Sequence, residues 1–174
     1  MKNFNSAPYK SFYKMGRNQE GFTLIEVLIT MVILSVGIFG LMKAADSTLF
    51  FQTHSKNVTE ATLNTTNNIE EVKQISANDP AGGAYGFNYL VTDYLTDEGF
   101  TKVDDWTYSK SETADNFTTT ITLQVYPAGG QEKFDDPTSI HMLELEVKTA
   151  WTDSRGGARD VEMATIIHRR QFIE

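Results

Sequence analysis

A single carboxylate interrupts an otherwise apolar stretch near the start of the chain. Residues 22–42 read FTLIEVLITMVILSVGIFGLM, and Glu26 is the one full charge among them. About 20 apolar residues are enough to cross the hydrocarbon core of a bilayer as a helix. An acid within such a helix is costly and is functional by default. The chemistry that a carboxylate offers there is pairing with a cation, so we expect Glu26 to do more than anchor the chain.

The residues ahead of this stretch are polar and basic. They include four cations and one acid, Lys2, Lys10, Lys14, Arg17 and Glu20. Positive charge before a span keeps that end in the cytoplasm, so we expect the rest of the chain to be translocated. No small-residue cleavage site of the secretory type follows Met42, and the one small junction lies in front of the span, at Gly21. A plain anchor, with Glu26 rescued by water near the membrane surface, is the alternative.

Residues 21–27, GFTLIEV, resemble the class III signal of type IV prepilins and type II secretion pseudopilins. That signal combines a glycine, an aromatic residue and a glutamate at the fifth place of an apolar helix. The continuation at residues 35–41, SVGIFGL, is similar to minor pilins of the PilV kind.

This resemblance implies a sequence of events at three residues. A prepilin peptidase would cut after Gly21 on the cytoplasmic side. The new amine of Phe22 would be N-methylated, and Glu26 would neutralise the terminal amine of a neighbouring subunit. Inside a helix bundle such a pair is poorly screened, so we hypothesise that it selects one axial register.

The family also implies partners and a location. The span would anchor the protein in the inner membrane with its soluble part in the periplasm, and would then join other pilins, major and minor, in an extracellular filament. The inner-membrane assembly platform is a further expected partner. A leader of 21 residues is long for this family, and we expect Met15 rather than Met1 to be the start.

Charge and cysteine content limit the possible functions. The net charge is −8 and there is no cysteine. The leader contributes +3, which leaves −11 for the rest. An acidic exterior disfavours nucleic-acid binding; the alternative is a basic patch formed by Arg155, Arg159, Arg169 and Arg170. With no disulfide available, stability must come from packing.

A second helical stretch, about residues 46–76, follows the span. Apolar or small residues recur there at steps of three and four, at Val58, Ala61, Thr65, Ile69, Val72 and Ile75, which indicates one buried face. Residues 78–80, Asn-Asp-Pro, are expected to end this helix. Gly37 and Gly40 either let helices pack closely or form a soft point that bends.

Residues 77–115 are predicted to be an irregular connector, with a short helix or edge strand at residues 88–95. Its aromatic residues are Tyr85, Phe87, Tyr89, Tyr94, Phe100, Trp106 and Tyr108. Such residues usually pin a long loop onto the core; an exposed aromatic patch would instead indicate a subunit contact or an adhesin.

Three later segments, residues 117–125, 143–151 and 161–168, alternate between apolar and polar residues, as strands with one buried face do. The glycine turn at residues 153–157 predicts that the last two pair antiparallel. The helix stripe and this sheet face predict an α+β pilin fold. Its parts are a leader (1–21), the membrane half of the helix (22–45), the amphipathic half (46–76), the connector (77–115) and the sheet (116–174).

Catalysis finds no support in the residue inventory. His54, His141 and His168 lack metal-ligand spacing, and the acidic loops at residues 93–105 and 135–136 lack the spacing of an EF-hand, although Ca²⁺ there stays open. We expect no enzyme activity, cofactor or metal. The leading function is a minor pilin of a type IV pilus; a type II secretion pseudopilin and a pilin-anchored adhesin are the alternatives.

Overall fold

The computed structural model describes residues 21–77 and 86–169. It divides into two compact units, residues 1–45 and 46–174, and each is described by itself. The first unit contributes the beginning of helix α1, whose bounds are Leu24–Ala77. The expected leader with its two candidate starts, the helix stop at residues 78–80 and Arg170 all lie outside the described residues.

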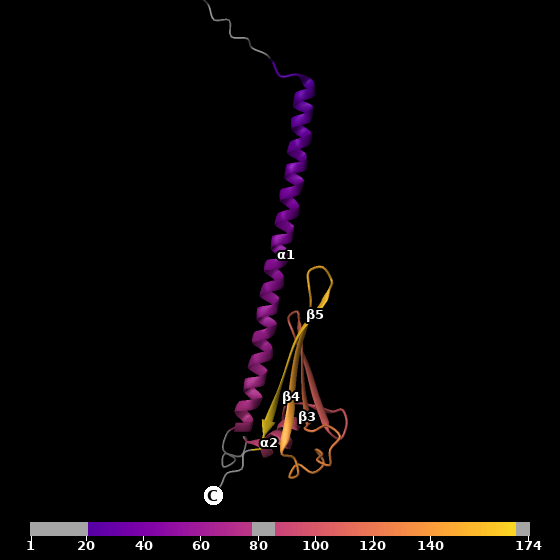
Figure 1. Ribbon diagram of the computed structural model, residues 1–174. Coiled ribbons are helices and arrows are strands. Elements are labelled where there is room, and N and C mark those ends of the chain that lie inside the picture. Colours follow the sequence, from indigo (N-terminus) through magenta and orange to yellow (C-terminus); the bar gives the residue numbers. More distant parts are fainter. Residues whose placement is uncertain (1–20, 78–85, 170–174) are drawn as a thin grey trace, which may run out of the picture. The chain divides into compact units, whose positions relative to one another are not determined.

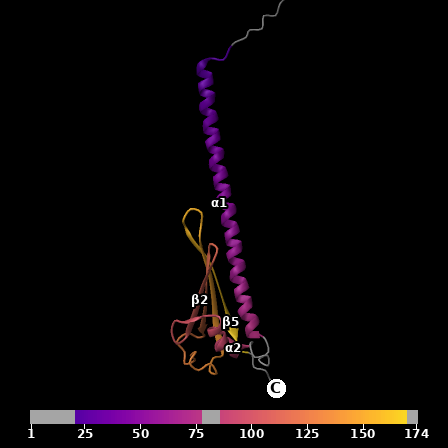
Figure 2. The same ribbon diagram turned by 180° about the vertical axis from the view of Figure 1, so that it is seen from behind.

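The second unit is a two-layer domain. It contains the remainder of α1 and seven further elements: α2 (Phe87–Val91), α3 (Asp93–Asp97), β1 (Thr101–Lys102), β2 (Thr107–Ala114), β3 (Phe117–Val125), β4 (Met142–Thr152) and β5 (Ala158–His168). The strands form one sheet in the order β1-β2-β3-β4-β5, with every neighbouring pair antiparallel. Figure 1 shows β3, β4 and β5 side by side with α2 at one end of the sheet, and Figure 2 shows β2 from behind.

The core lies between α1 and one face of the sheet. The helix buries Ala61, Thr65, Ile69 and Val72, which are four of the six stripe positions predicted from the sequence. The sheet buries alternate residues of its central strands, including Ile121, Leu123, Val125, Leu143, Leu145 and Val147. The predicted α+β fold, one long helix packed on an antiparallel sheet, is therefore confirmed.

Two hydrophobic clusters meet along this layer. The larger contains Ile69 and Val72, and the smaller consists of Ala61, Phe117 and Trp151 with Val58 and Val161 packed against it. Between them, buried Thr65 on α1 lies 2.9 Å from Thr149 on β4, and Thr149 lies 3.2 Å from Thr119 on β3 (hydroxyl to hydroxyl).

The expectation of an irregular connector is wrong in the part of residues 77–115 that the structure describes. Two short helices, α2 and α3, replace the single helix or edge strand expected at residues 88–95, and β1 and β2 extend the sheet from three strands to five. β2 lacks the apolar–polar alternation expected of a strand, because two residues on its inward side, Lys110 and Glu112, are charged. Their partners in β3 are Ile121 and Thr119.

The aromatic residues of this segment pin it to the core, as the sequence predicted. Phe87, Tyr94 and Phe100 are buried, and Tyr89, Trp106 and Tyr108 are partly buried against the same cluster. Tyr85 lies outside the described residues. The aromatic residues described in this segment thus do not form the exposed patch that would mark an adhesin.

The turn between β4 and β5 is organised by one carboxylate. Asp153, whose side chain is 4% exposed, accepts hydrogen bonds from the backbone N–H groups of Arg155 and Gly157 and from Nε of Arg159. A Cβ on Gly157 would lie 2.8 Å from Oδ2 of Asp153, so any other residue there would displace this hydrogen-bonded carboxylate. The predicted antiparallel pairing of β4 and β5 is confirmed.

Candidate functional site

Helix α1 begins with a cap made by Thr23. The backbone N–H of Glu26 donates to the Thr23 carbonyl at 3.0 Å and approaches its hydroxyl at 3.3 Å, and Val27 N–H also donates to that carbonyl. Thr23 and Glu26 have the spacing of a capping box. A carboxylate in the first turn also interacts favourably with the helix dipole. The local sequence therefore places Glu26 at the positive end of the helix.

The Glu26 carboxylate is exposed. In the described part of the chain it has no ion pair, so it is available to a cation from outside. Phe22, whose exposed fraction is 82%, precedes the cap. A Cβ built on Gly21 would meet nothing within 4 Å. The Gly21–Phe22 peptide bond is thus accessible, and it precedes a carboxylate that has no ion pair among the described residues.

The apolar residues of the first unit surround the helix on all sides. From Leu24 to Met42 every described side chain is exposed. This segment of α1 is long and apolar enough to cross a membrane. An isolated helix that is hydrophobic all round is suited to lipid or to a bundle of similar helices.

Four departures from this apolar surface share one side of the helix, while Ser35 lies on the opposite side and donates its hydroxyl hydrogen to the Met31 carbonyl at 2.7 Å. Taking Glu26 as the reference, 100° per residue places Thr30, Gly37 and Gly40 within about 40° of it. Thr30 turns its hydroxyl to the carbonyls of Glu26 and Val27, at 2.8 and 2.9 Å. The helix continues through both glycines, so neither interrupts it here. We call these four residues the small-polar side of the span.

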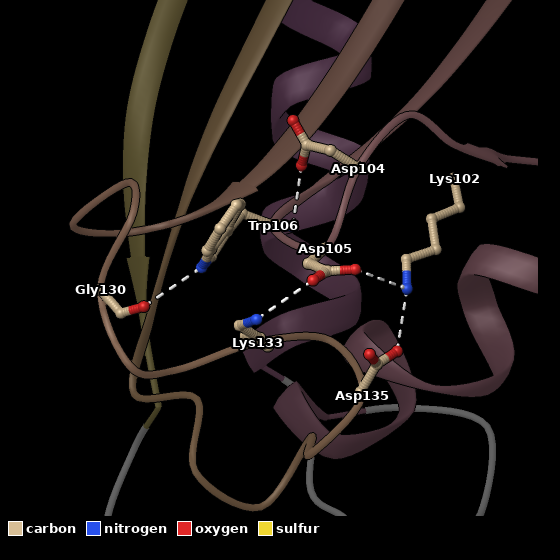
Figure 3. A network of polar contacts seen from close by, with 7 residues as sticks. All are labelled: Lys102, Asp104, Asp105, Trp106, Gly130, Lys133 and Asp135. Carbon is tan, nitrogen blue, oxygen red and sulfur yellow. Dashed lines mark hydrogen bonds and ion pairs between the residues drawn. The ribbon is translucent and has the colours of Figure 1, made fainter.

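Two carboxylates of the acidic loops, Asp105 and Asp135, are paired with lysines. Figure 3 shows Asp105 between Lys133 at 3.1 Å and Lys102 at 3.4 Å, while Lys102 also contacts Asp135 at 2.9 Å. The hydrogen bond from Lys133 is the main reason that the pKa of Asp105 lies below its usual value; the bond to Asp135 raises the pKa of Lys102. These acids already have cationic partners.

The same network joins two loops that are far apart in the sequence. Nε1 of Trp106, after β1, donates to the carbonyl of Gly130 at 3.2 Å, and Lys133 lies 4.9 Å from the centre of the indole ring. Asp104 accepts a hydrogen bond from the backbone N–H of Trp106. The network therefore fixes the loop between β3 and β4 against the turn between β1 and β2.

The remaining candidates for chemistry are dispersed. Arg155 lies in the β4–β5 turn and Arg159 at the beginning of β5, whereas Arg169 lies beyond the opposite end of β5 and donates to the carbonyls of Pro137 and Thr138. The described arginines thus do not form the basic patch considered above. No group of three His, Asp or Glu residues that could hold a metal occurs among the residues that the structure describes.

Comparison with known proteins identifies the first unit alone. Residues 16–42 match a family described as the prokaryotic N-terminal methylation motif. No curated protein and no solved structure matches the chain. The matched residues include Gly21, Phe22, Glu26 and the small-polar side. Together with the long helix packed on an antiparallel sheet, this match supports a prepilin of the type IV pilin kind, whose motif marks structural rather than catalytic proteins.

Proposed function

We propose that this protein is a minor pilin, a structural and assembly subunit of a type IV pilus without enzymatic activity or cofactor. A prepilin peptidase cuts after Gly21, the amine of Phe22 is N-methylated, and the helix enters the filament beside other pilins. The protein waits in the inner membrane, with residues 46–174 in the periplasm, until the assembly platform extracts it. The span at residues 35–41 resembles that of minor pilins of the PilV kind.

The position of Glu26 carries this proposal. Its backbone is satisfied by the Thr23 cap, while its carboxylate is exposed and lacks an ion pair in the described part of the chain. Cleavage after Gly21 would create an ammonium group at Phe22, one helical turn away. In low dielectric an unpaired charge is expensive, so the terminal amine of one subunit and Glu26 of the next stabilise each other on assembly.

The surface of α1 beyond the span offers further contacts for neighbouring subunits. Leu49, Phe51 and Leu63 have exposed fractions of 63%, 64% and 57%. Apolar side chains of this size gain stability when another helix covers them. The division of the chain that we propose is a leader (1–21), the membrane and assembly half of the helix (22–45), the amphipathic half (46–77), and then α2, α3 and a sheet that begins at Thr101 rather than at residue 116.

The deciding experiment is mass spectrometry of the protein from purified filaments. The proposal requires methyl-phenylalanine at Phe22 as the first residue. Glu26→Gln should insert in the membrane and be cleaved normally but be absent from filaments. Glu20→Gln is the matched control, because it removes an equal charge from the segment that is cut away, and it should be incorporated normally. Normal incorporation of Glu26→Gln would contradict the assigned role.

The second candidate is a minor pseudopilin of type II secretion, because the motif at residues 21–27 is common to both systems. Deletion of the gene separates the two functions. Loss of surface pili with normal protein secretion supports the pilus, and the reverse supports secretion. A pilin-anchored adhesin is the weaker alternative, since the described aromatic residues of the connector pack inward.

A further inference from the structure

Among the described residues, the outer edge of β5 has backbone groups without a strand partner. β5 is the last strand of the sheet, and in the described residues it pairs with β4 alone. Its odd-numbered residues form the bonds to β4, because Arg169 N–H donates to His141 and Asp153 N–H donates to Gly157, at the two ends of the ladder. Antiparallel pairing alternates. Glu162, Ala164 and Ile166 therefore direct their N–H and C=O groups away from the sheet.

The opposite edge of the sheet is protected, and part of β5 is not. At β2, β1 covers Tyr108 and Ser109, and beyond them Lys110 and Glu112 place charges on the inward side, 2.7 Å apart. Inward charges and short edge strands are the usual devices that stop another strand from adding. In β5, Asp160 and Glu162 protect the first half, but residues 163–167, MATII, contain no charge.

A groove accompanies this unprotected stretch. It measures about 440 Å³ and lies between α1, which contributes Thr66, Ile69 and Lys73, and β5, which contributes Met163 and Ala164. Glu70 and Lys73 form an ion pair of 3.1 Å at the helix side. A strand added to β5 would direct alternate side chains into this groove, where Ile69 and Met163 offer apolar contact.

The outer face beside the same stretch is acidic. In the register of β4 and β5, Glu146 lies opposite Ala164 and Glu144 lies opposite Ile166. Neither acid has an ion pair among the described residues, whereas Asp160 and Glu162 share Lys148 at 3.3 and 3.5 Å. Neighbouring strands are about 4.8 Å apart. A Lys or Arg on an added strand would therefore reach Glu146 across the small Ala164.

We propose that the edge of β5 at residues 163–167 binds an extended strand of another protein subunit, with apolar side chains toward α1 and Lys or Arg on the outer face. The outward N–H and C=O groups of β5 favour a partner in extended conformation, and Glu144 and Glu146 favour a partner with positive charge. Pairing of β5 with β5 of a second copy is disfavoured, because both strands carry Asp160 and Glu162. The site deepens the proposed function: it rests on that function in taking the partner to be another pilin-type subunit.

The test uses the full chain in detergent micelles and a synthetic peptide of alternating valine and lysine, with blocked ends. Amide hydrogen exchange is read residue by residue. At a peptide concentration of about ten times the dissociation constant, exchange at Ala164 and Ile166 should slow about tenfold. The odd-numbered amides, already bonded to β4, should not change.

Two matched pairs isolate the backbone contribution. Ala164→Pro removes one outward N–H group at an edge position, where proline is tolerated, and should abolish peptide binding; Ala164→Ser keeps that group and should bind as the parent does. A peptide N-methylated at alternate valines should also fail to bind. This peptide test does not depend on the folding of the proline variant.

Glu146→Gln should weaken binding several-fold and reduce its salt dependence.

Three results would overturn the proposal: no exchange change at any peptide concentration, protection at the β2 edge instead, or equal binding by Ala164→Pro and Ala164→Ser. The proposed function fails on a different observation, absence of the mature chain from filaments. The peptide result is obtained without filaments, so the two failures can be distinguished.

Discussion

The hydroxyl oxygen of Thr65 on α1 lies 2.9 Å from that of Thr149 on β4, and both side chains are completely buried. Thr65 also bonds to the carbonyl of Ala61 at 2.9 Å, and Thr149 continues to Thr119. Each hydroxyl can donate one hydrogen. The oxygens therefore form a chain that connects the helix to two strands at the boundary between the hydrophobic clusters.

Replacing two members of this chain should cost less than the sum of the two single replacements. Thr149→Val leaves the buried Thr65 hydroxyl with fewer partners and should lower the free energy of unfolding by about 1–2 kcal/mol. Thr65→Val with Thr149→Val should cost less than the sum of the single variants by about 0.5–1 kcal/mol. Urea unfolding of residues 46–174 gives these values, and strict additivity would argue against a shared network.

The carboxylate of Asp153 should make the domain sensitive to acid. The backbone N–H of Gly157 is the main cause that holds its pKa below the ordinary 3.8, with help from Arg155 and Arg159. A lowered pKa in the folded state means that the stabilisation is present above pH 3.8 and is lost as the pH falls through the lower, folded value.

Asp153→Asn should therefore be less stable than the parent at pH 7 and should lose less of its stability on acidification. The comparison is the thermal midpoint at pH 7 and at pH 3. Asp115→Asn is the control, because Asp115 is exposed at a φ of 52° that asparagine readily adopts. An unchanged pH profile in Asp153→Asn would show that other carboxylates govern acid unfolding.

Arg155 should stabilise the part of α1 with which the second unit begins, near Asp46 and Phe50. Its guanidinium carbon lies 3.8 Å from the centre of the Phe50 ring, and Nη2 lies 3.7 Å from Asp46. Arg155→Ala should accelerate amide exchange in residues 50–56 while leaving the sheet unaffected. Arg155→Lys should recover the charge but little of the protection, since the planar group that stacks on Phe50 is lost. Equal recovery by lysine would mean that charge alone matters.

Trp106 should control the order of the β3–β4 loop. Trp106→Phe keeps an aromatic ring but removes the indole N–H and its hydrogen bond to the Gly130 carbonyl, and loss of that bond has an expected cost of about 1 kcal/mol. Exchange should become faster at residues 129–134 and stay constant in β4. Tyr126→Phe, a change on an exposed ring of the same region, serves as the control. If both variants behave alike, the indole bond does not restrain the loop.

The sequence predicted the parts of this fold whose patterns are apolar. β3, β4 and β5 alternate cleanly, and the stripe of α1 ends buried as expected. β2 was missed because Lys110 and Glu112 occupy its inward positions, where burial would normally place apolar residues. A lysine at an inward position of a strand can be explained only from the structure. Lys110 lies near the edge of the sheet, and its ammonium group pairs with Glu98 at 3.2 Å.

The candidate site rests on a shorter sequence pattern than the fold around it. Gly21, Phe22 and Glu26 follow from a short motif of residue types, and that motif does not depend on distant contacts. The cap by Thr23 was not predicted, although a threonine three residues before a glutamate at the start of an apolar run is its signature. The free edge of β5 could not be predicted, because strand order is a property of the assembled sheet.

The small-polar side distinguishes one direction around the axis of the span from all others. A helix that is apolar on every side makes equivalent contacts with lipid at every rotation about its own axis. Such a helix can therefore rotate in a membrane at little cost. Glu26, Thr30, Gly37 and Gly40 break that symmetry along one line. Without such a line the rotation of the helix about its own axis would be undefined, and a second helix that packed against the line would define that rotation.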